Sequence, residues 1–205
     1  MDKTKFKKIY NDLVDIFPPE TDNPRFRYLK RTWIFPNHID IGIKFVQKLA
    51  KKYQANMEIC ILGSLLHDAG LSYKRKKSDS IGHEKRSVEY ANKSLLKYGY
   101  DQDIIIAVLG CIRATEAEIE PKIIEERVVR TADALAHILS IHYFAKVSFS
   151  PDWESGVRFL EKKVEWDWQK ICFNDEREQV RSIYEYLKQI VKQYRRGINL
   201  NLKKC

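Results

Sequence analysis

Two histidines and two aspartates of this chain have residue types and positions that suit a metal ion. His67 and Asp68 are adjacent and follow the most apolar stretch of the sequence, residues 59–66. Burying such a titratable pair is costly unless another group compensates its charge. His38 and Asp133 supply two further candidate ligands from distant parts of the chain, and Asp133 lies within an apolar helical face. Together these four residues predict a buried metal site.

The chemistry of this ligand set is hydrolytic. Two neutral imidazoles and two carboxylates almost neutralise one divalent ion, and such a mixed nitrogen and oxygen set suits Mn, Fe, Co, Ni or Zn. Four protein ligands leave coordination positions for water and for a substrate oxygen. Bound water becomes a hydroxide nucleophile near neutral pH, and the ion polarises a phosphoryl oxygen. We therefore predict that a metal-bound hydroxide attacks a phosphate ester, with Asp68 counted as both a ligand and a catalytic residue.

Several other residues could complete the site, and each also has a purely structural interpretation. His83 could donate a proton to the leaving oxygen, or it could be an exposed residue at a helix start. Glu84 could orient a catalytic water molecule, although a glutamate in a first turn also suits the helix dipole. His137 shares a helical face with Asp133, where it could support the site or only pack. The candidate phosphate-binding residues, which could instead be solvated, are Lys74, Arg75, Lys77 and Arg113.

The order of the four candidate ligands resembles the signature of the HD-domain superfamily of metal-dependent phosphohydrolases. That signature is a histidine, then a His-Asp pair, then a distant aspartate. The resemblance covers residues from about 30 to about 145, and its matching segments are Leu65-Leu66-His67-Asp68-Ala69-Gly70, Gly82-His83-Glu84 and Arg130-Thr131-Ala132-Asp133-Ala134-Leu135. It implies a helical bundle around the metal and the hydrolysis of phosphomonoesters, phosphodiesters or nucleoside triphosphates.

The resemblance also bears on the number of metal ions. Two-metal branches of the superfamily have two extra histidines between the His-Asp pair and the last aspartate. His83 could be the first, but the region after Ile112, where the second is expected, reads Arg113-Ala114-Thr115-Glu116. We therefore expect one ion and a mononuclear hydrolase. The same departure argues against the di-iron oxygenase chemistry of some relatives.

The distribution of glycine and proline favours an all-α fold. Eight glycines and six prolines are few for 205 residues, and they fall between periodic segments. We expect a compact helical bundle of the HD-domain type, with an N-terminal helix and loop over 1–29, the HD domain over 30–147 and a C-terminal helical extension over 148–205 that packs on the same core. Helices are expected over 3–16, 38–53, 56–69, 81–98, 101–113, 121–147, 153–170 and 175–195, with loops over 17–36 and 71–80.

Individual residues predict several helix ends and one packing face. Asn37 should cap a helix start, Gly70 and Gly99 should each end a helix, and Pro121 should open one. A helix break is expected near His142, to which we assign no function. The packing face expected for the helix over 153–170 contains Trp153, Phe159, Val164 and Trp168.

Composition limits the class of protein. An apolar fraction of 44% is too high for a disordered chain. The four cysteines form no C-x-x-C pair of the kind that suggests structural zinc. Neither a signal peptide nor an apolar run of about 20 residues occurs, which predicts a cytoplasmic protein without a membrane span.

The net charge of +9 indicates anionic partners without selecting one. The favoured partner is a small phosphorylated substrate, above all a nucleotide. The alternative is a metal-stabilised protein that binds a nucleotide or RNA without turnover. Nucleic acid is less favoured, because the basic residues are spread along the chain and are not interleaved with aromatic residues. A homodimer is compatible with the sequence.

Overall fold

The regular structure of the chain is helical. The computed structural model describes residues 2–19, 29–73, 82–116 and 118–202, with side chains as far as Arg195. No residue in these ranges belongs to a β-strand, so the all-α prediction is confirmed. None of the described helices is both long enough and apolar enough to cross a membrane.

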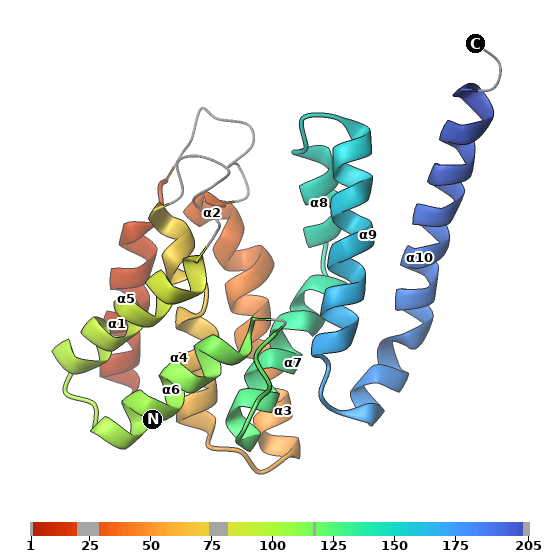
Figure 1. Cartoon of the computed structure of the whole chain (residues 1–205). Helices are drawn as coiled ribbons and strands as arrows, with labels where there is room; N and C mark the ends of the chain where they lie inside the picture. Colours follow the sequence, from red (N-terminus) through yellow and green to blue (C-terminus); the bar gives the residue numbers. More distant parts are fainter. Residues whose placement is uncertain (1, 20–28, 74–81, 117, 203–205) are drawn as a thin grey trace.

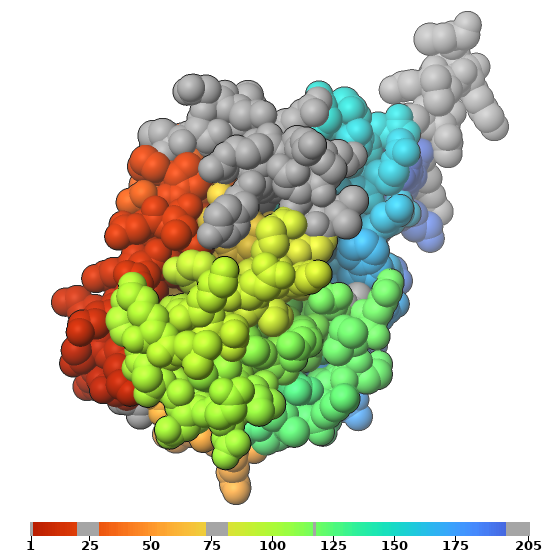
Figure 2. Space-filling view, turned by 60° about the vertical axis from the view of Figure 1, so that its left-hand side comes forward, coloured from red at the N-terminus to blue at the C-terminus, as the bar shows by residue number. Residues whose placement is uncertain are grey.

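The helices form one bundle with the C-terminal pair at its side. In chain order they are α1 (Lys3–Ile16), α2 (Arg31–Ile34), α3 (Asp40–Lys52), α4 (Met57–Leu66), α5 (His83–Lys97), α6 (Gln102–Ala114), α7 (Ile124–Ile138), α8 (His142–Ser148), α9 (Trp153–Lys170) and α10 (Asn174–Leu202). Figure 1 shows α8, α9 and α10 on one side of α7, and α1 on the opposite side of the bundle. Figure 2 shows α5 and α6, in yellow-green, on the face between them.

Helix α4 forms the centre of the bundle. It begins at Asn56, whose side-chain oxygen accepts from the backbone N–H groups of Glu58 and Ile59. Every residue from Cys60 to Leu66 is buried, because α4 packs against α3, α6 and α7. A helix that is apolar on all sides suits such a position.

Two apolar clusters meet at α4. One joins residues of α1, α5 and α6 to Leu62, Leu65 and Leu66. The other joins residues of α3, α7, α9 and α10 to Cys60 and Ile61. The end of α4 therefore lies between two packed layers, and the C-terminal helices share a core with α3 and α7.

Residues 31–36 of the loop predicted over 17–36 are helical, and residues 20–28 lie outside the described structure. Residues Arg31–Ile34 form α2, and a π-helical turn, Phe35–Ile39, continues directly into α3. Asn37 is therefore not an N-cap, and its Nδ2 donates to the backbone oxygen of Trp33 at 2.9 Å. The proline of this turn lies at its start, where a missing N–H costs little. π-Turns are frequent at functional sites.

Several other helix ends differ from the prediction. Helix α4 ends at Leu66, and Gly70 lies in the 3₁₀ turn Ala69–Tyr73 that follows. Helix α7 begins at Ile124 and not at Pro121, and α10 runs beyond the predicted end at 195. The bounds 3–16 and 153–170, the break before His142 and the closure of α5 at Gly99, which has a φ of 65°, are confirmed.

The inward face of α9 also needs a correction. Trp153 is 66% exposed and does not belong to the packing face. The buried residues of this helix are Gly156, Val157, Leu160, Val164, Asp167 and Lys170. Two charged side chains thus continue an otherwise apolar stripe toward the bundle.

Gly63 marks a close approach between α4 and its neighbours. A Cβ at this position would lie 2.8 Å from Cβ of Cys111 and 3.3 Å from Cγ2 of Val129. We expect Gly63→Ala to lower the free energy of unfolding by about 1–3 kcal/mol, because overpacking outweighs the better helix propensity of alanine. Urea denaturation followed by circular dichroism measures this change.

Gly110→Ala is the matched control for the crowding at Gly63. A Cβ at Gly110 would meet only the flexible side chain of Glu126, which can move away. The free energy of unfolding should therefore stay the same or rise by up to about 1 kcal/mol. An unchanged stability of Gly63→Ala would show that α4 is less tightly enclosed than these contacts indicate.

Candidate metal centre

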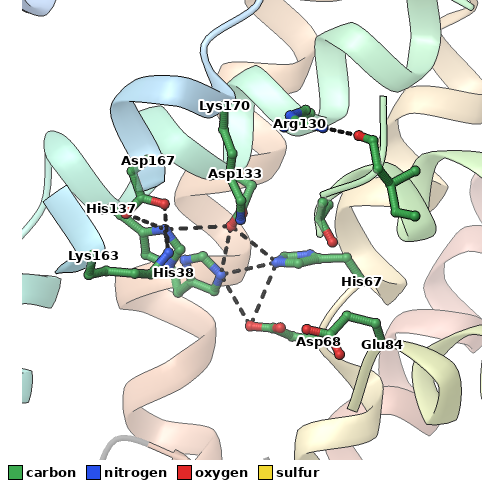
Figure 3. Close-up of polar contacts among 12 residues, drawn as sticks. His38, His67, Asp68, Glu84, Arg130, Asp133, His137, Lys163, Asp167 and Lys170 are labelled. Carbon is green, nitrogen blue, oxygen red and sulfur yellow. Dashed lines mark hydrogen bonds and ion pairs between the residues drawn. The ribbon is translucent and has the colours of Figure 1, made fainter. Parts of the chain in front are cut away.

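Four side chains from three segments converge at one buried point (Figure 3). His38 comes from the π-helical turn, His67 and Asp68 directly follow α4, and Asp133 lies within α7. None of the four is more than 9% exposed. The structure thus brings together the four residues that the sequence prediction named as ligands.

Short distances join one atom of each of these side chains. Nε2 of His38 lies 3.1 Å from Nε2 of His67, 3.2 Å from Oδ2 of Asp68 and 3.5 Å from Oδ1 of Asp133. Nε2 of His67 lies 3.6 Å from Oδ2 of Asp68 and 3.4 Å from Oδ1 of Asp133. Two nitrogen atoms and two oxygen atoms therefore face one another.

The hydrogen bonding of these atoms fits a divalent ion. Nδ1 of His67 lies 2.7 Å from the backbone oxygen of Ser64, so Nδ1 can carry the proton while Nε2 presents a lone pair. Oδ1 of Asp133 is buried and has no hydrogen-bond partner among the described residues. Such an oxygen is costly, and a cation held by these donors would satisfy it. The mixed donor set suits the first-row divalent metals named above.

Burial and charge shift the ionisation of these groups. Burial alone would lower the pKa of His67, but the carboxylates of Asp68 and Asp133 raise it to about 9. Burial opposes the ionisation of both aspartates, yet His67 holds the pKa of Asp68 well below its usual range, and Lys170 does the same for Asp133. With no cation present, His67 is therefore protonated at neutral pH and both carboxylates are charged.

A close contact between the 3₁₀ turn and α5 positions His83. The N–H of Gly70 donates to Oγ of Ser87 at 2.8 Å, and Nε of Arg86 donates to the oxygen of Gly70 at 3.2 Å. A Cβ on Gly70 would lie 2.0 Å from the backbone oxygen of His83, so this approach requires glycine. Nε2 of His83 then lies 3.6 Å from Oδ1 of Asp68.

His83 and Glu84 form a partly exposed edge of the cluster. Nδ1 of His83 lies 3.1 Å from Oε1 of Glu84, and the two side chains are 22% and 24% exposed. The imidazole is thus flanked by the carboxylates of Asp68 and Glu84. The structure places both predicted catalytic residues next to the candidate ligands.

The predicted phosphate-binding residues do not all lie in the described structure. Those outside the described residues are Lys74, Arg75 and Lys77. Arg113 is exposed in the last turn of α6. Close to it, Glu116 has a pKa raised by burial and by the charge of Glu84, so this carboxyl group lies near the partly exposed edge of the cluster.

Charged residues of α9, which the sequence analysis did not select, complete the cluster. Nζ of Lys170 lies 3.1 Å from Oδ2 of Asp133, and this lysine is 8% exposed. Nζ of Lys163 lies 2.6 Å from Oδ1 of Asp167, whose other oxygen accepts from Oη of Tyr143 at 2.7 Å. The sequence did contain a signal: Asp167 and Lys170 continue the apolar stripe of this helix at helical spacing, where a charge is costly.

His137 fills the space between the candidate ligands and α9. Its ring stacks on that of His38 with centroids 4.5 Å apart, and its Nδ1 lies 3.3 Å from Oδ2 of Asp167 and 3.1 Å from Nζ of Lys163. Burial and the charge of Lys163 lower the pKa of His137 to about 4, so the ring is neutral at neutral pH. The ring centroid of the buried His142 lies 4.4 Å from that of His137.

Comparison with known proteins gives a family match. Residues 17–138, more than half of the chain, match the family model for the HD domain. The matched segment contains all four candidate ligands together with His83 and Glu84, and it ends before α9. No curated protein and no solved structure matches the chain.

The raised pKa of His67 predicts that metal binding depends on pH. An ion must displace the proton that His67 holds below about pH 9. We therefore expect Mn²⁺ to bind with release of a proton, and its Kd to fall by up to about tenfold per pH unit between pH 7 and pH 9. Isothermal titration calorimetry in buffers of different ionisation enthalpy measures both quantities.

Two variants test whether His67 is the source of the proton. His67→Gln should bind Mn²⁺ more weakly and with little dependence on pH in this range. His142→Gln changes a buried histidine outside the four candidate ligands and should retain proton release. A pH-independent Kd for the unaltered protein would contradict the assigned protonation of His67.

Proposed function

Because the chain belongs to the HD-domain family, we propose that it is a metal-dependent phosphohydrolase that acts on a nucleotide or another small phosphate ester. The observation that carries this proposal is the convergence of His38, His67, Asp68 and Asp133. The two Nε2 atoms lie 3.1 Å apart, and each lies 3.2 to 3.6 Å from one oxygen of both aspartates. A single divalent ion held by these residues would polarise a phosphoryl oxygen and lower the pKa of a water molecule.

The proposed proton transfer uses His83. Its Nε2 lies beside Oδ1 of Asp68, while Oδ2 of the same carboxylate faces the candidate ligands. Asp68 thus joins the metal site to the imidazole. Because His83 is partly exposed, it can donate a proton to a leaving oxygen and then take up another from solvent. Glu84 orients this ring and is placed to hold a water molecule.

We infer an anionic substrate from the net positive charge of the protein. The excess of nine positive charges raises the local concentration of anions around the protein. Nucleotides and other phosphorylated metabolites are such anions. We propose that Lys74, Arg75, Lys77 and Arg113 bind phosphate oxygens of the substrate.

The same positive charge also favours a second candidate function, which is binding of a nucleotide or RNA without turnover. In that case the four ligands would hold a structural ion. The two functions differ in one observable: only the hydrolase releases inorganic phosphate or a phosphorylated product.

A metal-by-substrate screen tests the proposed hydrolysis. The protein is loaded in turn with Mn, Fe, Co, Ni or Zn and assayed on phosphomonoesters, phosphodiesters and nucleoside triphosphates. We expect at least one combination to be hydrolysed, and we expect Asp68→Ala to lose at least about 100-fold in kcat/KM, since changes beyond the ligands themselves already cost 10–100-fold.

Metal content distinguishes loss of the site from loss of the fold. Asp68→Ala should lose bound metal, measured by atomic emission, while keeping its helical circular dichroism spectrum. Asp103→Ala, at an exposed position in the first turn of α6, is the control and should retain both metal and activity. Full activity of Asp68→Ala would refute the proposed site. Salt-sensitive nucleotide or RNA binding without any product would favour the second function.

A further inference from the structure

The ion pair between Lys170 and Asp133 has an unusual setting. Lys170 comes from α9, outside the segment that matches the HD domain, yet its ammonium reaches Oδ2 of a candidate metal ligand at 3.1 Å. Both side chains are buried. Oδ1 of the same carboxylate faces His38 and His67, so Asp133 lies between the ammonium and the candidate metal site.

A divalent ion at the candidate site changes the charge balance around Lys170. Asp68 and Asp133 carry two negative charges, which a divalent ion neutralises, and the imidazole ligands are neutral. Lys163 and Asp167 neutralise each other through their contact at 2.6 Å. Until an anion binds the ion, Lys170 then remains as a buried positive charge whose partner carboxylate is already taken by the ion. A buried charge without a counter-ion is costly.

The other charged groups nearby do not remove this excess. Glu84 and Glu116 are negative, but both are only partly buried and therefore screened by water. The loaded site thus has a buried positive charge beside the candidate ligand Asp133.

We propose that Lys170 binds the phosphoryl group of the substrate and the phosphate product, as the counter-charge that the loaded site requires. This inference rests on the proposed phosphohydrolase function and assigns to it a phosphate-binding residue outside the matched family segment. An ammonium is a compact point charge with three donors. One donor can stay on Oδ2 of Asp133 while another contacts a phosphate oxygen.

Inorganic phosphate binding to the Mn²⁺-loaded full-length protein tests the proposal without turnover. Lys170→Met should raise the Kd for phosphate by about 10–100-fold, the effect of losing one charged hydrogen bond. Its affinity for Mn²⁺ should be unchanged or higher, because a positive charge beside a metal ligand has been removed. A merely structural role of Lys170 would instead weaken metal binding through a misplaced Asp133.

Two further variants serve as controls. Lys162→Met removes an exposed lysine of the same helix and should leave the phosphate Kd within about twofold of the unaltered protein. Lys170→Gln keeps a donor for Asp133 without the charge, so it reports on phosphate binding even if Lys170→Met does not fold. In steady-state assays, both Lys170 variants should lower kcat/KM by about the same factor as they weaken phosphate binding.

The outcomes separate this inference from the proposed function. Hydrolysis by the unaltered protein together with unchanged phosphate affinity in Lys170→Gln would overturn the role of Lys170 and leave the hydrolase intact. An unaltered protein that neither hydrolyses any phosphate ester nor binds phosphate with Mn²⁺ would overturn both. A similar loss in Lys162→Met would show that the general positive charge of α9, and not Lys170, is responsible.

Discussion

Asp68 and Asp133 remain charged although the helices around them remove both carboxylates from water, and the surrounding structure has to compensate this desolvation. Imidazoles do so on one side, since Nε2 of His38 lies within 3.5 Å of an oxygen of each aspartate. On the other side, the ammonium of Lys170 contacts Asp133. Neither arrangement satisfies Oδ1 of Asp133, which is buried without a hydrogen bond among the described residues. The fold therefore holds both carboxylates without a metal ion but leaves one carboxylate oxygen without a hydrogen bond, as expected of a cation-binding site.

The packing of α4 explains why these charges can be held so closely. Because α4 contributes to both apolar clusters, its C-terminal end is fixed from two sides, and the His67-Asp68 pair that follows has little freedom to turn toward solvent. Glycine at position 63 lets α6 and α7 approach the helix, and glycine at position 70 lets the next turn contact α5. The first approach brings α7 toward the pair, and the second brings His83. The positions of the candidate ligands and of His83 thus depend on two glycines, Gly63 and Gly70.

Sequence reasoning identified the helices and the four candidate ligands because both leave a local signal. Apolar periodicity marks a helix, and a charge inside an apolar run marks a site. The π-turn around His38 could not be predicted in this way, because a proline and several aromatic residues indicate a loop and because the wider turn is set by packing against α1 and α4. Lys170 was missed for a related reason. Its partner lies 37 residues away, so its position next to Asp133 depends on how α9 packs against α7. Trp153 shows the opposite kind of error. Its apolar side chain suggested burial, but it lies at the start of α9 and is mostly exposed to solvent.

The contacts of α9 show that the candidate site extends beyond the segment that matches the HD domain. The match to the HD domain stops at residue 138, and a boundary near residue 147 looked natural from the sequence. However, α9 and α10 contribute to the same apolar cluster as α3 and α7. Tyr143, Asp167, Lys163 and Lys170 extend the polar network of the site into this part of the chain. An ion pair buried at such a contact makes the packing of α9 and the ionisation of Asp133 interdependent, because removing either partner leaves an uncompensated charge. The C-terminal helices therefore share the core of the bundle, and α9 forms part of the wall of the candidate metal site.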